Sequence, residues 1–317
     1  MPGGTTTLSE VRVRLAAEPV SVPGARRFVA DGLTSWGRPA LVEDAALCVT
    51  EMASNAALHS GSGFMDVSMQ DHRASVRICV EDEGRAPVQA VVSPMPERTG
   101  PVAPEDEPTT GRGLMIVSIL ASSWGVEETR SGNRIWAEIS GGNDEHPTRI
   151  SRTPPSPARA APSSLPDGWG VVRLVGCPVE LSLRSDQHLD ELIRELQLID
   201  GDEDNPPSRQ IATVVETLLQ APAFARHTGR RIVQEAAAAG LDLVDVEMTM
   251  PRAVAAGVRD LQRAVRRADA LCEREEMLTL ASTPEMRAIR SWMAECLITQ
   301  PEGAEPVSFA DWLARTP

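Results

Sequence analysis

Small and apolar residues recur at alternating intervals of four and three between Pro39 and His59. This spacing marks one face of an α-helix, and we expect that face to pack against a sheet. The members of the face are Val42, Ala46, Val49, Ala53 and Ala56.

The opposite face of this predicted helix is more polar. Residues four apart are neighbours on a helix surface, so Glu51 and Asn55 should share one site. Either residue alone would usually be a solvated side chain. The pair indicates a functional site only in combination with the other motifs of the chain. The same face also carries Asp44, Cys48 and Leu58.

Two strands with one buried face each should follow the HSGSG turn. In the first, Met65, Val67 and Met69 alternate with polar residues, and in the second Val76, Ile78 and Val80 do so. Between them we expect a hairpin turn at residues 71–73. The alternation places Asp82 on the buried face at the end of the second strand, where a carboxylate needs a partner.

Residues 88–110 are rich in proline and acidic groups and show no periodicity, which predicts a mobile loop. The sequence GRGLMIVSILASSWG should then form an apolar helix that begins at glycines. A strand, NRIWAEI, should follow, with Ile135, Ala137 and Ile139 on one side. This order of helix, hairpin, loop, helix and strand predicts an α/β fold.

Residues 141–168 are rich in proline, serine and glycine and predict a disordered linker between domains. A chain of 317 residues is long enough for two domains. We therefore expect one domain over residues 1–140 and a second over residues 169–317.

The second domain should be mainly helical, with a regulatory or dimerisation role, because it carries no recognisable catalytic pattern. GVVRLVGCPVELSL predicts a strand or a pair of strands, SDQHLDELIRELQLI predicts an amphipathic helix, and residues 241–248 suit either a strand or a helix. Heptad spacing predicts a seam in a helical bundle or a homodimer. Its members are Val254, Val258, Leu261, Val265, Ala268 and Cys272.

Charge and composition narrow the class of partner. A formal net charge of −14 disfavours sequence-independent binding to nucleic acid, which requires clustered positive charge. No apolar run is long enough to span a bilayer, and the N-terminus lacks the apolar segment of a signal peptide, so we expect a cytoplasmic protein without membrane contact. The five scattered cysteines should be reduced and mostly buried.

Three motifs occur in an order known from one family. They are TEMASNAALHS at residues 50–60, VEDEG around Asp82 and TGRGLMIV around Gly111. Together, over residues 8–140, they resemble the Bergerat-type (GHKL) ATP-binding domain of bacterial anti-sigma-factor serine kinases. The resemblance implies a two-layer α/β sandwich, with a mixed sheet covered by helices.

The resemblance also assigns candidate roles at the nucleotide. It implies that Asp82 accepts a hydrogen bond from the adenine amino group and that Gly84 lets the ring approach. The glycines Gly111 and Gly113 would wrap the phosphates at a helix N-terminus. Arg112 lies between them, and because the chain contains no lysine, any side-chain cation at the phosphates must be an arginine.

Two further roles follow from residue chemistry. The amide oxygen of Asn55 is a hard ligand that suits Mg²⁺. Glu51, one turn earlier, is a candidate catalytic base for an attacking hydroxyl. His59 and His72 receive no catalytic role, and His72 should be exposed in the hairpin turn. One departure from the family is Arg85-Ala86-Pro87 after Gly84, where further glycines are common, and this loop should be stiffer than usual.

The function we expect is that of an ATP- and Mg²⁺-dependent protein serine/threonine kinase. By resemblance it would bind a sigma factor and phosphorylate an anti-anti-sigma protein, regulating transcription by partner switching. The alternative is a nucleotide-gated protein that transfers no phosphate and sequesters a partner when ATP closes the 88–110 loop. A second half that senses a small ligand is compatible with both.

His188 resembles the phosphoacceptor of a sensor histidine kinase. In that family, however, the phosphoacceptor helices precede the ATP domain, whereas here His188 follows it.

Overall fold

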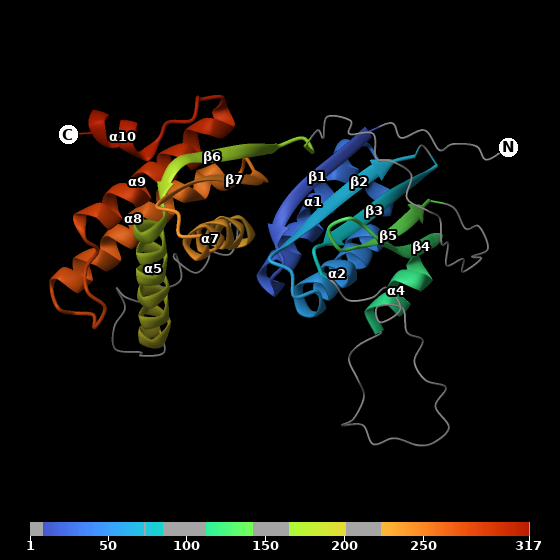
Figure 1. Ribbon diagram of the computed structural model, residues 1–317, viewed down its shortest axis with the longest axis horizontal. Coiled ribbons are helices and arrows are strands. Elements are labelled where there is room, and N and C mark those ends of the chain that lie inside the picture. Colours follow the sequence, from blue (N-terminus) through green and yellow to red (C-terminus); the bar gives the residue numbers. More distant parts are fainter. Residues whose placement is uncertain (1–8, 73, 85–111, 142–164, 201–222, 317) are drawn as a thin grey trace, which may run out of the picture. The chain divides into compact units, whose positions relative to one another are not determined.

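The computed structural model describes residues 9–72, 74–84, 112–141, 165–200 and 223–316. The chain divides into two compact units, Met1–Asp167 and Gly168–Pro317 (Figure 1). The predicted mobile loop at 88–110 and most of the predicted linker at 141–168 lie outside the described residues.

The first unit contains a five-stranded sheet with the strand order β1-β2-β3-β5-β4. The four pairings between neighbouring strands are all antiparallel, so the described sheet is not mixed as predicted. Short connections between β2 and β3 and between β4 and β5 favour antiparallel neighbours. The strands are β1 (Ser9–Ala16), β2 (Phe64–Asp71), β3 (Ser75–Asp82), β4 (Ser123–Glu128) and β5 (Asn133–Ser140).

Helices form the second layer of this unit (Figure 1). Helix α1 (Val22–Ser35) follows the short 3-10 helix η1 (Pro19–Ser21), and α2 (Val42–His59) follows η2 (Pro39–Leu41). Helix α2 packs against α1, against β2, β3 and β5, and against α4 (Arg112–Leu120). The predicted two-layer α/β sandwich is confirmed.

The core of the first unit lies between the sheet and these helices. The apolar residues predicted to point inward from β2, β3 and β5 are each at most 5% exposed. Strand β1, which the sequence pattern did not reveal, adds Val11, Val13 and Leu15 to this core. Asp82 is 8% exposed, so its predicted inward orientation is also confirmed.

Two predictions about the helices of this unit were wrong. The helix expected over GRGLMIVSILASSWG ends at Leu120, and residues from Ser123 onward form β4, because Trp124 pairs with Ala137 of β5. Cys48, expected on the polar face of α2, is fully buried. Helices α1 and α4 pack against α2 in addition to the sheet and widen its buried arc, and burial raises the pKa of the Cys48 thiol to about 12.

The second unit combines one strand pair with several helices. Strands β6 (Trp169–Pro178) and β7 (Leu243–Pro251) are antiparallel, so most of the segment 241–248 belongs to a strand rather than a helix. GVVRLVGCPVELSL forms one strand and the start of a helix. The helices are α5 (Val179–Asp200), α7 (Ala223–Ala238), α8 (Val254–Glu273), α9 (Pro284–Thr299), η3 (Gln300–Glu302) and α10 (Phe309–Arg315). This part of the chain is mainly helical, as predicted.

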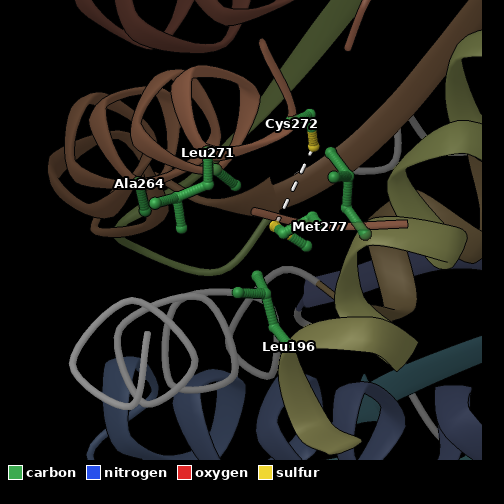
Figure 2. Close-up of a cluster of buried hydrophobic side chains, with 7 residues drawn as sticks. Leu196, Ala264, Leu271, Cys272 and Met277 are labelled. Carbon is green, nitrogen blue, oxygen red and sulfur yellow. Dashed lines mark hydrogen bonds between the residues drawn. The ribbon is translucent and has the colours of Figure 1, made fainter. Parts of the chain in front are cut away.

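The predicted heptad seam lies on α8, and part of it is covered within its own unit. Ala268 and Cys272 of α8 join Leu192 and Leu196 of α5 in a buried apolar cluster. Figure 2 shows this cluster, in which the Cys272 thiol lies 3.9 Å from the sulfur of Met277. The cluster covers these positions without a second copy, so their burial supplies no argument for a homodimer.

All five cysteines are buried and unpaired, as predicted. Among the described residues, no helix has the length and apolar character needed to cross a bilayer.

Candidate functional site

Helix α2 positions two of the predicted site residues on one face. Glu51 and Asn55 lie one turn apart, and both are partly exposed. The first turn of α4 approaches Glu51 at Gly113, where a Cβ atom would lie 2.6 Å from Glu51 Oε2. The structure therefore brings the first and third sequence motifs together, at a point where a Cβ atom would require the Glu51 carboxylate to move.

Asp82 ends β3 and points into the layer between sheet and helices. Its Oδ1 accepts a hydrogen bond of 2.8 Å from the backbone N–H of Gly84. Burial raises the pKa of this carboxyl group above its ordinary value, and the hydrogen bond from Gly84 opposes the shift. An ionised carboxylate offers about four acceptor positions, so Asp82 can accept a further hydrogen bond from a ligand.

Gly84 allows the end of β3 to meet the C-terminal end of α2. A Cβ atom at Gly84 would lie 2.6 Å from the Ser60 carbonyl oxygen and 2.8 Å from Asp82 Oδ1. Ser62, just after α2, also binds the segment that follows β3, because its hydroxyl accepts a hydrogen bond of 3.1 Å from the Glu83 N–H. Asn55 lies between the contacts at Glu51 and Ser60 along α2, so one helix supports both halves of the site.

Two positions beside Asp82 were missed by the sequence analysis. Asn133 of β5 lies opposite Asp82, is 6% exposed, and donates a hydrogen bond of 3.2 Å from Nδ2 to the Gly84 carbonyl. A Cβ atom at Gly132 would lie 2.1 Å from the Asp82 carbonyl oxygen. Their only local signal is the SGN turn before a predicted strand, and the register between β3 and β5 is needed to connect them with Asp82.

The phosphate end of the predicted site is described only in part. Gly111 and the side chain of Arg112 lie outside the described residues, so their predicted roles stay predictions. Gly113 lies in the first turn of α4, where backbone N–H groups have no partner within the helix and suit an anion.

The histidines take no part in this site among the described contacts. His59 is exposed at the end of α2. His72 was expected to be exposed but is partly buried, and burial lowers the pKa of its ring. Its ring lies near Arg77 of β3 and Glu138 of β5, whose charges also act on its pKa.

His188 in the second unit is unsuited to phosphoryl acceptance. It is 7% exposed, its Nε2 lies 2.7 Å from the Leu280 carbonyl oxygen, and its Nδ1 lies 3.0 Å from Arg290 Nη2. Because Arg290 can only donate, Nδ1 accepts and Nε2 carries the proton. Both ring nitrogens are thus engaged in holding the fold.

Comparison with known proteins agrees with the geometry of the first unit. A comparison with curated proteins found no match to the sequence. The family model described as "Histidine kinase-like ATPase domain" matches residues 15–139, a range that contains Glu51, Asn55, Asp82 and Gly113. Over this range the chain is therefore similar to histidine kinase-like ATPase domains, which supports an ATP-binding domain of the GHKL type.

Proposed function

We propose that the first unit binds Mg·ATP and transfers the γ-phosphoryl group to a serine or threonine of a partner protein. The observation that carries this proposal is the contact between Glu51 and the first turn of α4 at Gly113. It puts a carboxylate next to the helix N-terminus at which the phosphates of a nucleotide would bind.

Asp82 is the residue that would recognise adenine. Its carboxylate is buried, and the Gly84 N–H satisfies only part of its acceptor capacity. The adenine amino group is a donor that matches the remaining capacity, whereas guanine presents a carbonyl oxygen at that position. Asn133 holds the Gly84 carbonyl and keeps this edge of the site in place.

The polar face of α2 would bind the metal ion and accept a proton beside the phosphates. Asn55 would offer its amide oxygen to Mg²⁺, and Glu51 would accept the proton of the attacking hydroxyl. Bound Mg·ATP supplies the phosphoryl group and neutralises the charge on it. The chain's own residues orient the nucleotide and receive the proton.

The regulatory role is proposed from the resemblance to anti-sigma-factor kinases. The partners would be a sigma factor, held by the protein, and an anti-anti-sigma protein that accepts the phosphoryl group. The protein would then regulate transcription by partner switching in the cytoplasm.

The test uses the full chain with radiolabelled ATP, Mg²⁺ and candidate anti-anti-sigma proteins of the source organism. Glu51→Gln should keep ATP affinity within about threefold and lower transfer by about 10²-fold or more, because it removes a proton acceptor without removing a metal ligand. The matched control is Glu43→Gln, an exposed position in the first turn of the same helix.

The outcomes separate the two hypotheses stated above. Undiminished transfer by Glu51→Gln would remove Glu51 as the base. ATP binding without transfer to any candidate would favour the nucleotide-gated binding protein instead. An absence of ATP binding would overturn both.

A further inference from the structure

The second unit contains a partly open cavity of about 460 Å³ that the first unit's chemistry does not use. It lies between the β6-β7 pair and helices α5, α7, α8 and α9. Apolar side chains form most of its walls, including Leu174, Val246, Met248, Val233 and Val258. Sites for small molecules commonly have volumes of about 300–1,000 Å³ and mostly apolar walls with a few polar groups.

The charge of this cavity differs in sign from that of the whole chain. Its lining contains five arginines but only two aspartates, Asp186 and Asp269, although the chain carries a formal net charge of −14. Asp190 pairs with the same arginines as Asp186, and Glu273 pairs with Arg287, so that among the described residues an excess of one positive charge remains. Such a lining favours an anionic group over a neutral or cationic one.

Most of the lining arginines have carboxylate partners. Arg226 contacts both Asp186 and Asp190, at 2.7 and 2.6 Å, and Arg230 contacts the same two aspartates. Arg287 lies 2.5 Å from Glu273 and 3.6 Å from Asp269.

Arg290 is different, because it is partly buried and, within the described part of the chain, its guanidinium hydrogen-bonds only neutral groups, whereas the fifth lining arginine, Arg266, is exposed to solvent. It donates to the hydroxyl and carbonyl oxygens of Ser185, both at 3.0 Å, to the Ser282 hydroxyl at 2.7 Å and to His188 Nδ1 at 3.0 Å. Burial lowers the pKa of Arg290. A guanidinium has five N–H donors, so one on Nη1 remains beyond these four bonds.

The nearest negative charge is reached through a hydroxyl. The Ser282 hydroxyl, which accepts from Arg290, donates to Asp269 Oδ1 at 2.7 Å. Asp269 is thereby engaged by Ser282 and Arg287. Arg290 is a partly buried cation at the edge of an apolar cavity without a directly bound counter-ion among the described residues, and such a charge is stabilised by an anionic partner.

We propose that this cavity binds a small amphipathic carboxylate, with its apolar body against the β6-β7 pair and α7 and its carboxylate at Arg290. A single carboxylate matches the one remaining donor and the mostly apolar walls better than a phosphate, which would require several donors. Binding at this site requires neither ATP nor phosphoryl transfer, so it can be tested independently of the function proposed for the first unit.

The test compares ligands that share one apolar chain and differ in their charged group. Decanoate, decan-1-ol and decyltrimethylammonium are titrated calorimetrically into the full chain at neutral pH, below their micelle-forming concentrations, with naphthalene-2-carboxylate as a second carboxylate. We expect one-to-one binding of a carboxylate, at least tenfold weaker binding of the alcohol, and no binding of the ammonium compound.

Variants locate the binding site. Arg290→Met should abolish the preference for carboxylate over alcohol, whereas Arg231→Met, a partly exposed position on α7 outside the cavity, should keep it. Since Arg290→Met could disturb folding through Ser185 and Ser282, Val233→Trp provides a second variant. It fills part of the cavity, and it should abolish binding of decanoate and decan-1-ol alike.

The proposal is overturned if neither carboxylate binds, if the alcohol or the ammonium compound binds as tightly as decanoate, or if Val233→Trp folds and binds decanoate as the parent does. Loss of ATP binding or phosphoryl transfer, with carboxylate binding intact, would contradict only the function of the first unit.

Discussion

The carboxylate of Glu51 lies against Gly113, so that a Cβ atom at residue 113 would be 2.6 Å from Glu51 Oε2 and 3.5 Å from Glu51 Cβ. The two residues belong to different helices and to different sequence motifs. Besides lying in the first turn of α4, Gly113 therefore leaves the space that the side chain of the candidate base, Glu51, occupies.

Gly113→Ala should lower phosphoryl transfer by at least tenfold while leaving the fold intact. An alanine stabilises a helix interior by about 0.5–1 kcal/mol relative to glycine. The displaced Glu51 side chain would cost about as much through a poorer rotamer, so the melting temperature should change little. Transfer assays and thermal melts measure the two effects, with Met115→Ala on the exposed side of α4 as the control. Full activity of Gly113→Ala would show that the position of Glu51 is unimportant.

Asn55→Ala should weaken Mg·ATP binding by about tenfold or more, because Mg²⁺ loses a hard oxygen ligand. Binding of ATP in the presence of EDTA should change much less. Asn55→Asp keeps an oxygen at the same position and should retain metal dependence. Calorimetric titrations with and without Mg²⁺ measure this difference, and an unchanged Mg²⁺ dependence in Asn55→Ala would argue against a metal-binding role.

Asp82→Asn should reduce the preference for ATP over GTP. The parent carboxylate only accepts hydrogen bonds, whereas an asparagine side chain can also donate to the guanine carbonyl. We expect the ratio of ATP to GTP affinity to fall by about tenfold, since a mismatched hydrogen-bonding group in a buried site costs about 1–3 kcal/mol. Competition binding measures the ratio, and equal ratios in parent and variant would exclude Asp82 as the adenine contact.

The same substitution should stabilise the protein at neutral pH. Burial raises the pKa of Asp82, so the folded state binds a proton at pH values where the unfolded state has released it. The free energy of unfolding contributed by this group is then greatest below the ordinary pKa of aspartate and falls as pH rises through the raised pKa. Asparagine carries no such dependence.

Asp82→Asn should therefore melt a few degrees higher than the parent near pH 7, a gain of about 1 kcal/mol. The gain should shrink as the pH is lowered toward 4. Denaturant unfolding between pH 4 and 7.5 tests this, and a gain that grows on acidification would contradict the sign of the pKa shift.

The domain boundaries predicted from the sequence can be tested with fragments. Fragment 1–150 should bind ATP, and fragment 169–317 should be soluble, helical and melt cooperatively, because each compact unit contains its own buried core. Circular dichroism and calorimetry measure both properties. An unfolded C-terminal fragment, or an N-terminal fragment that does not bind ATP, would show that the two units depend on each other.

The residue patterns by themselves determined the elements that carry the strongest periodicity and the short motifs within them. The helix with Glu51 and Asn55, the hairpin before Asp82 and the inward faces of three strands follow from spacings of a few residues. Such patterns depend on which face of an element is buried, and each is encoded within about a dozen neighbouring residues.

Tertiary structure decided what depends on segments that are distant in the sequence. The pairing of β1 with β2, the burial of Cys48 on α2, and the positions of Gly132 and Asn133 beside Asp82 all come from contacts between separate elements. The cavity around Arg290 is of the same kind, because four helices and two strands contribute to it. No local spacing encodes such contacts, since they arise only when the apolar faces of different elements are buried together.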